Sequence, residues 1–277
     1  MMRRLMGVLV VTMLASPAMV SGQAVDANKV LTEMQAALGG TEKLAAIKTL
    51  TVEGMLRRVT PRGTLELTME LALELPDKYV TRTQLTAQGN MSVYRNAGFN
   101  GDDLINRAEA PPNLAGAGRD RARSDRAAMA QTNEQSAATA QRQLMNAKSD
   151  FARLALGLFG ASYEGFPVQL SYAGLAESPD GNAHVIGAQG ADGFEARLFV
   201  SAETNLPLMV TWSQALPRDP NTMQEHRIYY SNFKTVNDVS FPHTWRRSVD
   251  GNVTAETTLE QIEINPEIDS KKFEISR

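Results

Sequence analysis

A run of strict alternation between apolar and polar residues, Leu65–Leu75, constrains the fold of this chain more than any other feature. Leucine or methionine stands at every odd position, and the even positions are Glu66, Thr68, Glu70, Ala72 and Glu74. Alternation with a period of two predicts a β-strand with one apolar and one polar face. At about 3.3 Å per residue the strand would span roughly 36 Å, about twice an ordinary strand. Its apolar face must be covered by a helix, a second sheet or a ligand.

The N-terminus has the pattern of a secretory signal peptide. Arg3 and Arg4 precede the apolar stretch Leu5–Ala15, which is too short to span a bilayer, and small residues follow up to Ala24. We therefore expect residues 1–24 to be a cleaved signal peptide and residues 25–277 to form a single exported, soluble domain, most simply in a periplasm. An uncleaved membrane anchor is the alternative, but no second apolar stretch of spanning length follows. The chain has no cysteine, which excludes disulfides and thiol chemistry.

Composition argues against a nucleic-acid partner. The net charge is −3 and becomes about −5 once Arg3 and Arg4 are removed with the signal, whereas nucleic-acid binding needs clustered positive charge. A hydrophobic content of 43% is typical of a globular protein, and the chain is long enough to bury one sizeable core. We expect a monomer that is not an integral membrane protein.

The order of predicted elements indicates an α+β fold built on one large antiparallel sheet. An amphipathic helix is predicted at Asp26–Leu38 and a short one at Thr41–Ile47, and a longer helical segment at Arg119–Gly160. Roughly eleven strands surround that segment. Those before it are predicted at Leu50–Val59, Thr64–Leu75, Tyr79–Ala87 and Met91–Phe99. Those after it are predicted at Val168–Leu175, Ala183–Ala188, Phe194–Ser201, Leu208–Leu216, Arg227–Lys234, His243–Val249 and Asn252–Ile264.

Sequence motifs for catalysis and nucleotide binding are absent. The chain contains no Walker loop, no Gly-x-Gly-x-x-Gly, no His-Glu-x-x-His and no Gly-x-Ser-x-Gly. The three histidines, His184, His226 and His243, fall on separate predicted strands, where such residues usually belong to the surface or to the core rather than to a metal site. We expect no enzymatic activity, no catalytic residue, no metal and no cofactor.

Three charged clusters are interpreted as solvated surface. The pair Asp102-Asp103 could bind a cation, and the row Glu66, Glu70 and Glu74 could supply paired carboxylates, but a solvated turn and a solvated outer strand face are the simpler interpretations. The segment Arg119–Arg126 could bind an anionic surface. Because Asp120 and Asp125 interrupt its positive charge, a solvated helix end is favoured.

Short motifs along the chain resemble those of periplasmic outer-membrane lipoprotein-sorting proteins and their LolA/LolB-like relatives. The similar motifs are the helix end Ala36-Ala37-Leu38-Gly39-Gly40 with the following Leu44–Leu50, the strand–turn–strand Leu198–Leu208 with its Thr204-Asn205-Leu206-Pro207, and the closing motifs Val239-Ser240-Phe241-Pro242, Asp250-Gly251 and Ile264–Asp269. The segment 110–160 matches least, and no residue of this chain is assigned as the family's lid arginine.

The resemblance implies an unclosed (half) β-barrel whose concave face is covered by helices, with residues 110–160 as a helical insertion or lid. It also implies a cavity for acyl chains. The residues predicted to line this cavity are Leu65, Leu67, Met69, Leu71, Leu73, Leu75, Leu31, Met34, Phe151, Leu154 and Leu158. The same side chains packed on one another would form an ordinary dry core, so both a cavity and a filled core are consistent with the sequence.

The leading hypothesis is a non-enzymatic periplasmic carrier or sensor that binds a lipid, a lipoprotein acyl chain or another hydrophobic ligand. Its partners would be that ligand or lipoprotein and an envelope protein. The alternative is a ligand-free envelope scaffold or protein-interaction module on the same fold. An outer-membrane barrel is disfavoured by the large helical segment at Arg119–Gly160 and by the non-aromatic ending Ile275-Ser276-Arg277.

Overall fold

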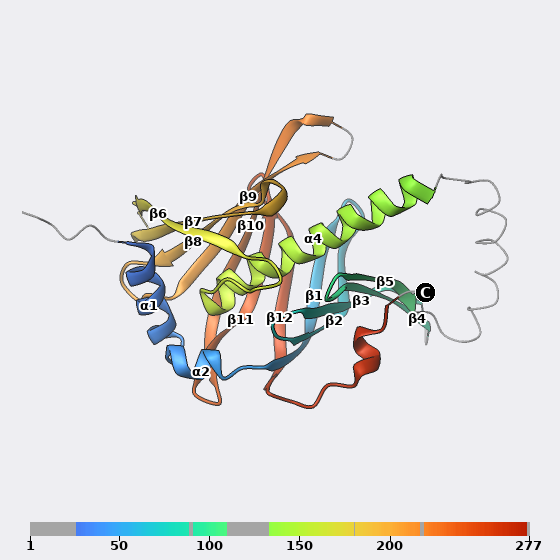
Figure 1. Cartoon of the computed structure of the whole chain (residues 1–277), viewed down its shortest axis with the longest axis horizontal. Helices are drawn as coiled ribbons and strands as arrows, with labels where there is room; N and C mark the ends of the chain where they lie inside the picture. Colours follow the sequence, from blue (N-terminus) through green and yellow to red (C-terminus); the bar gives the residue numbers. More distant parts are fainter. Residues whose placement is uncertain (1–25, 89–90, 110–132, 180, 217–218, 276–277) are drawn as a thin grey trace, which may run out of the picture.

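One antiparallel sheet of twelve strands organises the molecule (Figure 1). The fold is given by a computed structural model that describes residues 26–88, 91–109, 133–179, 181–216 and 219–275. Both the expected signal peptide, residues 1–24, and residues 110–132 of the expected insertion lie outside these ranges. The strand order is β5-β4-β3-β2-β1-β12-β11-β10-β9-β8-β7-β6, and the two edge strands do not pair with each other.

The sheet consists of two meanders that meet at its centre. The first runs outward through β1 (Thr49–Thr60), β2 (Gly63–Glu74), β3 (Lys78–Gln88), β4 (Met91–Asn100) and β5 (Asp103–Glu109). The second starts at the opposite edge and returns through β6 (Val168–Ala176), β7 (Ala183–Gly190), β8 (Glu195–Ser201), β9 (Pro207–Leu216), β10 (Asp219–Val236), β11 (Val239–Val249) and β12 (Asn252–Ile264). Strand β12 pairs with β1, where Ile264 lies opposite Leu50.

The helices gather on one face and one end of the sheet. Helix α4 (Asn133–Phe159) crosses the concave face, contacting β4 and β5 towards one edge and β8 and β9 towards the other (Figure 1). Helices α1 (Ala27–Ala37) and α2 (Thr41–Ala45) lie beyond the C-terminal end of α4, and the side chain of Asp26 caps α1 by accepting a hydrogen bond from the Lys29 N–H. The Gln35 amide donates to the carbonyls of Phe159 and Gly160 and so ties α1 to the end of α4. Two short 3-10 helices, η1 (Ala191–Gly193) and η2 (Ser270–Phe273), complete the fold.

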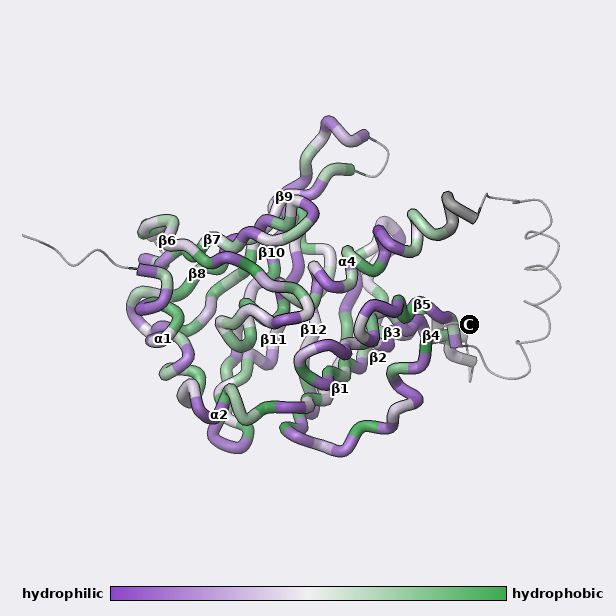
Figure 2. The backbone as a smooth tube through the Cα atoms, in the orientation of Figure 1, coloured by the Kyte–Doolittle hydropathy of each residue, from purple (hydrophilic) through white to green (hydrophobic). Residues whose placement is uncertain are grey.

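Apolar side chains of the concave face and of the helices form one continuous core. Leu50, Val52 and Leu73 from the sheet pack in the same cluster as Phe151 and Met34 from the helices. Figure 2 shows hydrophobic and hydrophilic residues alternating along the strands, as expected for a sheet with one covered face. On the opposite face a second, small cluster forms where Phe273 of η2 covers Ala72, Val80 and Ile105.

The predicted fold class is confirmed: the protein is an α+β open half-barrel with helices on its concave face. The prediction of roughly eleven strands was wrong by one, because β5 was not recognised. Its sequence, Asp-Leu-Ile-Asn-Arg-Ala-Glu, is short and polar, as edge strands often are. Helix α4 falls within the range 119–160 predicted to be helical. None of the helices described is long and apolar enough to cross a membrane.

Candidate functional site

A cavity of about 450 Å³ lies between the concave face of the sheet and α4. Its apolar lining comprises Leu56, Val59, Met69, Leu71, Leu154, Ile228, Ala255, Trp212 and Trp245, and its polar lining includes Arg58, Thr81, Thr83, Asp150, Arg153, Arg247, Thr254 and Thr257. Ligand-binding pockets in proteins typically measure about 300–1,000 Å³ and combine apolar walls with a few polar groups. This cavity therefore has the size and lining of a site for a small amphiphilic molecule.

Strand register makes one end of the cavity apolar and the other charged. Along β1 the residues Val52 and Leu56 face inward opposite Leu71 and Leu67 of β2. The next inward position of β1 is Arg58, close to the β1–β2 turn, and the residue opposite it on β12 is Ala255. The same row continues onto β11, where Ala255 pairs with Arg247. The sheet wall of the cavity thus has aliphatic and threonine side chains towards the middle of the strands and arginines near the strand ends.

Helix α4 adds a third arginine to the cavity wall. The Arg153 side chain is only 12% exposed, and its Nη1 lies 3.0 Å from Oδ1 of Asp150. Its guanidinium carbon lies 4.5 Å from the ring centroid of Trp212 and 5.2 Å from that of Phe194. Burial lowers the pKa of Arg153, and the carboxylate of Asp150 opposes this shift. Arg153 is therefore held in place by an acidic partner and two aromatic rings.

Both tryptophans of the chain line the cavity. The Trp212 indole stacks on the imidazole of His226, with 5.2 Å between the ring centroids, and the Trp245 indole N–H donates to the carbonyl of Pro242. Among the residues that the structure describes, the Trp212 indole N–H is buried without a hydrogen-bond partner. Because indole emission depends on the surroundings of the ring, both side chains are built-in reporters of anything that enters the cavity.

The predicted lining residues are distributed between the cavity and the solid core. Met69, Leu71 and Leu154 line the cavity. Leu67, Leu73, Leu31, Met34, Phe151 and Leu158 are buried in the main core, and Leu75 is half-buried against it. Leu65 is 46% exposed and does not line the cavity, because β2 extends there beyond its pairing with β3, which begins at Met69.

The polar half of the lining was not predicted from the sequence. Arg58 lies on the same inward face of β1 as Leu50, Val52 and Leu56. An arginine at an inward position of a predicted strand could therefore have indicated the charged part of the lining. Arg247 and the two tryptophans were likewise not singled out. Arg153 lies among the apolar residues of the predicted helix face, next to Leu154, and sequence periodicity alone did not separate it from the solvated arginines of the segment.

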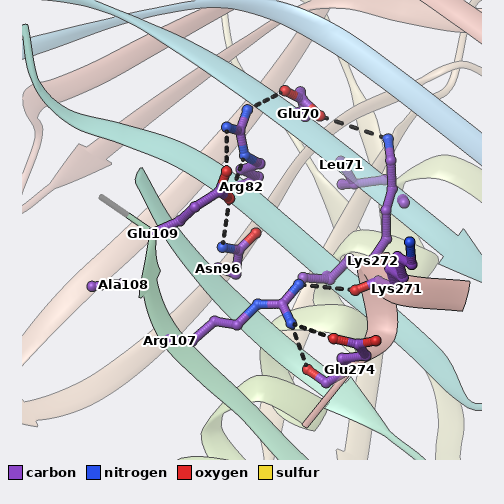
Figure 3. Close-up of a pocket in the computed structure, with 12 residues that line it drawn as sticks. Glu70, Leu71, Arg82, Asn96, Arg107, Ala108, Glu109, Lys271, Lys272 and Glu274 are labelled. Carbon is purple, nitrogen blue, oxygen red and sulfur yellow. Dashed lines mark hydrogen bonds and ion pairs between the residues drawn. The ribbon is translucent and has the colours of Figure 1, made fainter. Parts of the chain in front are cut away.

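A second hollow, of about 550 Å³, lies on the opposite face of the sheet under the C-terminal segment (Figure 3). Arg82 forms its centre, with Nη1 2.6 Å from Oε1 of Glu70 and Nε 3.1 Å from Oε2 of Glu109. The Arg82 guanidinium lowers the pKa of Glu109. Lys272 reaches the other oxygen of Glu70 at 3.6 Å, and Arg107 donates to the Lys271 carbonyl at 2.9 Å.

Arg82, Arg107 and Lys272 in this second hollow pair with Glu70, Glu109 and Glu274, and these ion pairs fasten the C-terminal segment to the sheet (Figure 3). Glu66, Glu70 and Glu74 lie on this outer face of the sheet, and two of them are ion-paired as well as partly exposed. Glu70 bonds Arg82, and Glu74 accepts from Lys78 at 2.7 Å. We accordingly place the candidate binding site in the concave cavity rather than here.

Metal ligation finds no support within the described ranges, where no group of three or more His, Cys, Asp or Glu side chains could hold an ion. The three histidines lie apart: His184 bonds the Tyr172 hydroxyl, His226 stacks on Trp212, and His243 bonds the Phe241 carbonyl. Asp102 is engaged with Lys148, whose Nζ lies 2.7 Å from Oδ1 and anchors α4 to the β4–β5 turn.

Solved structures share this architecture of an open half-barrel with a helix-covered concave face. A LolA superfamily protein from Nitrosomonas europaea matches with a TM-score of 0.51 and 10% identity, over 91% of this chain and 98% of that chain. A DUF1329 family protein from Desulfovibrio piger matches with a TM-score of 0.50 and 6% identity, over 90% of this chain and 97% of that one. No protein-family model matches the sequence, and no curated protein matches it.

The fold is therefore LolA-like. The resemblance inferred from the turn motifs is confirmed at the level of the fold, across nearly all of the chain.

Proposed function

We propose that this protein is an exported, non-enzymatic carrier or sensor that binds a lipid, a lipoprotein acyl chain or another hydrophobic ligand in the cavity between the sheet and α4. The observation that carries the proposal is the cavity of about 450 Å³, which combines apolar side chains such as Leu56, Met69 and Leu71 with the charged Arg58 and Arg247 near the ends of their strands. The LolA-like fold supports the same role. The signal-like residues 1–24 support a periplasmic location.

The energetics favour an alkyl chain as the occupant. Each methylene transferred from water to an apolar site contributes about 0.8 kcal/mol, so partial shelter of one chain suffices for reversible binding. Met69 and Leu71 offer a wall of flexible side chains that can adapt to an irregular ligand. Reversibility is what a carrier or a sensor requires.

The scaffold alternative rests on a different observation, the dense packing of most of the predicted lining. Met34, Leu73, Phe151 and Leu158 are almost completely buried in the main core. If this packing extends through the whole concave face in solution, the fold would serve as a platform for another protein and would take up no ligand. The two functions differ in a single measurable property, saturable binding of an acyl chain.

Two adjacent threonines provide a matched test. Thr257 is buried and lines the cavity, whereas Thr258 is exposed on the opposite face of β12. We expect monolauroyl glycerol, a neutral single-chain lipid, to change the emission of Trp212 and Trp245 in a saturable manner. Thr257→Phe places a ring in the cavity and should weaken this binding at least tenfold, and Thr258→Phe should leave it unchanged. Circular dichroism checks that both variants are folded.

Native mass spectrometry of gently purified protein gives an independent measurement. A co-purified lipid adduct that is lost in Thr257→Phe and kept in Thr258→Phe would support the carrier or sensor. Absence of any adduct, together with no saturable response to monolauroyl glycerol in the unmodified protein, would refute it and favour the scaffold.

A further inference from the structure

Two strands that flank β12 each carry a pair of consecutive arginines, and the pairs lie at the same level of the sheet. Arg57-Arg58 belongs to β1 and Arg246-Arg247 to β11, with β12 between them. Because side chains alternate across a strand, each pair sends one arginine to each face of the sheet. The two faces can therefore be compared at equal register.

On the convex face the two arginines share an acidic neighbour. Arg57 and Arg246 both lie opposite Glu256 of β12. Nη1 of Arg57 is 3.8 Å from Oε1 of Glu256, and Arg246 lies over the ring of Tyr229, 5.4 Å from its centroid. This face therefore has an Arg–Glu–Arg row in which the central carboxylate compensates the positive charge.

On the concave face the central position is occupied by alanine. Arg58 and Arg247 both lie opposite Ala255, whose short side chain leaves the space between them open, and all three residues line the cavity. Strands are about 4.8 Å apart, so the backbones of the two arginines are separated by roughly 10 Å, a gap that two guanidinium groups can close around one small anion. Neither arginine forms an ion pair with any residue in the described part of the chain.

The charge around this Arg–Ala–Arg row is unbalanced. The cavity is lined by three arginines and one carboxylate, and that carboxylate, Asp150, is already bonded to Arg153. Burial raises the pKa of the Tyr230 hydroxyl, and the positive charge of Arg247 partly offsets this rise. The Arg247 guanidinium therefore influences a buried group on the concave side of the sheet. Like charges gathered without a counter-ion favour the binding of an anion.

We propose that the cavity selects amphiphiles with an anionic head group, which Arg58 and Arg247 bind together across Ala255 while the alkyl chain lies against Leu56, Met69 and Leu71. Guanidinium groups match the planar oxygens of carboxylate and phosphate, and the charged row lies where the strands end, so the head group stays near solvent. The inference rests on the proposed function, because it assigns the head-group class of the same ligand.

The test compares lipids that share one chain and differ in head group, with tryptophan emission as the measure of affinity. Monolauroyl glycerol phosphate should bind about tenfold more tightly than monolauroyl glycerol, as expected from two partly exposed charge contacts. Laurate should rank between them. Raising the salt concentration should reduce the preference, because partly exposed ion pairs are screened. Inorganic phosphate alone should bind far more weakly than any of the three, because it has no chain to bury.

Double variants on the two faces supply the matched control. R58Q/R247Q should abolish the preference for the phosphate-bearing lipid, so that the ratio of the two affinities falls to about one, and circular dichroism checks that the variant is folded. R57Q/R246Q removes the same charge from the convex face and should keep the preference. R58K/R247K retains the charge and should keep a salt-dependent preference, which shows that the positive charge of these two positions carries it.

The outcomes separate the two proposals. If the unmodified protein binds monolauroyl glycerol but shows no preference for the phosphate, or if R57Q/R246Q loses the preference as fully as R58Q/R247Q does, the head-group inference is wrong and the carrier stands. Tight binding of inorganic phosphate without any chain would also overturn it. If no lipid binds, the proposed function itself fails.

Discussion

Arg153 of α4 lies over the indole ring of Trp212 of β9, with 4.5 Å between the guanidinium carbon and the ring centroid. His226 of β10 stacks on the same indole, with an angle of 14° between the two ring planes. These three side chains join the helix to two strands of the concave face. Arg153 and Trp212 belong to the cavity wall, and at this point a charged helix residue, rather than an aliphatic one, contacts the sheet.

Replacing Arg153 should loosen the attachment of α4. Arg153→Ala removes a cation–π contact with two rings and the packing of the aliphatic stem, which together should lower the free energy of unfolding by about 1–2 kcal/mol. Urea unfolding followed by circular dichroism measures this loss. Arg142→Ala on the exposed side of the same helix is the control and should cost less than about 0.5 kcal/mol. Equal losses in the two variants would contradict a special role for the Arg153–Trp212 contact.

His226 should make stability depend on pH in the weakly acidic range. Burial lowers the pKa of His226, and the positive charge of Arg153 lowers it further. Between the lowered pKa and the ordinary value of about 6.5, the unfolded chain binds a proton that the folded protein does not. The contribution of His226 to stability is therefore complete above about pH 6.5 and is lost as the pH falls through the lowered pKa.

The measurement for this prediction is urea unfolding at a series of pH values from about 7.5 down to 5.5, where few carboxylates titrate. His226→Asn should flatten the decline of the unfolding free energy with falling pH. Arg153→Met should flatten it partly, because one cause of the lowered pKa is removed while the imidazole remains. A decline of the same steepness in all three proteins would show that His226 is not its source.

Gly157 allows α4 to approach β10 as closely as it does. A Cβ atom at this position would lie 2.2 Å from the hydroxyl oxygen of Tyr230 and 2.3 Å from the ring carbon that bears it. Gly157→Ala should therefore destabilise the fold by about 1–3 kcal/mol, although alanine is the better helix former by about 1 kcal/mol. Gly165→Ala is the control, because its Cβ would meet only the Pro76 carbonyl oxygen, at 3.6 Å. Thermal unfolding compares the two, and a stabilised Gly157→Ala would refute the close approach.

Local patterns in the sequence predict most of this fold, because they specify strands and turns directly. Alternation identified β2, and Asp250-Gly251 marked the β11–β12 turn, where both residues adopt positive φ angles. Strand β5 has neither signal, since its seven residues are mostly polar and it is stabilised by pairing with β4. The order of strands across the sheet places β12 beside β1, a pairing between the two ends of the fold that no local pattern encodes.

The binding site was less predictable than the fold, for a physical reason. Whether an apolar side chain packs against another residue or lines a cavity depends on how far α4 stands from the sheet at each point. Sequence periodicity predicts the face of β2 on which the side chains of Met69 and Leu73 lie, but not the distance between each side chain and α4. Register across three strands brings Arg58 and Arg247 into one row, and their positions in the sequence give no indication of it.

Two leucines of the same strand test this distinction between direction and burial. Leu65 and Leu73 lie on the same face of β2, but Leu73 is completely buried and Leu65 is 46% exposed. Leu73→Ala should lower the free energy of unfolding by about 2–5 kcal/mol, because it removes buried methyl groups and leaves a cavity. Leu65→Ala should cost less than about 1 kcal/mol, because its side chain is already half in water. Urea unfolding of both variants decides the matter, and comparable losses would mean that something in solution covers the exposed end of β2 as firmly as α4 covers the centre of the sheet.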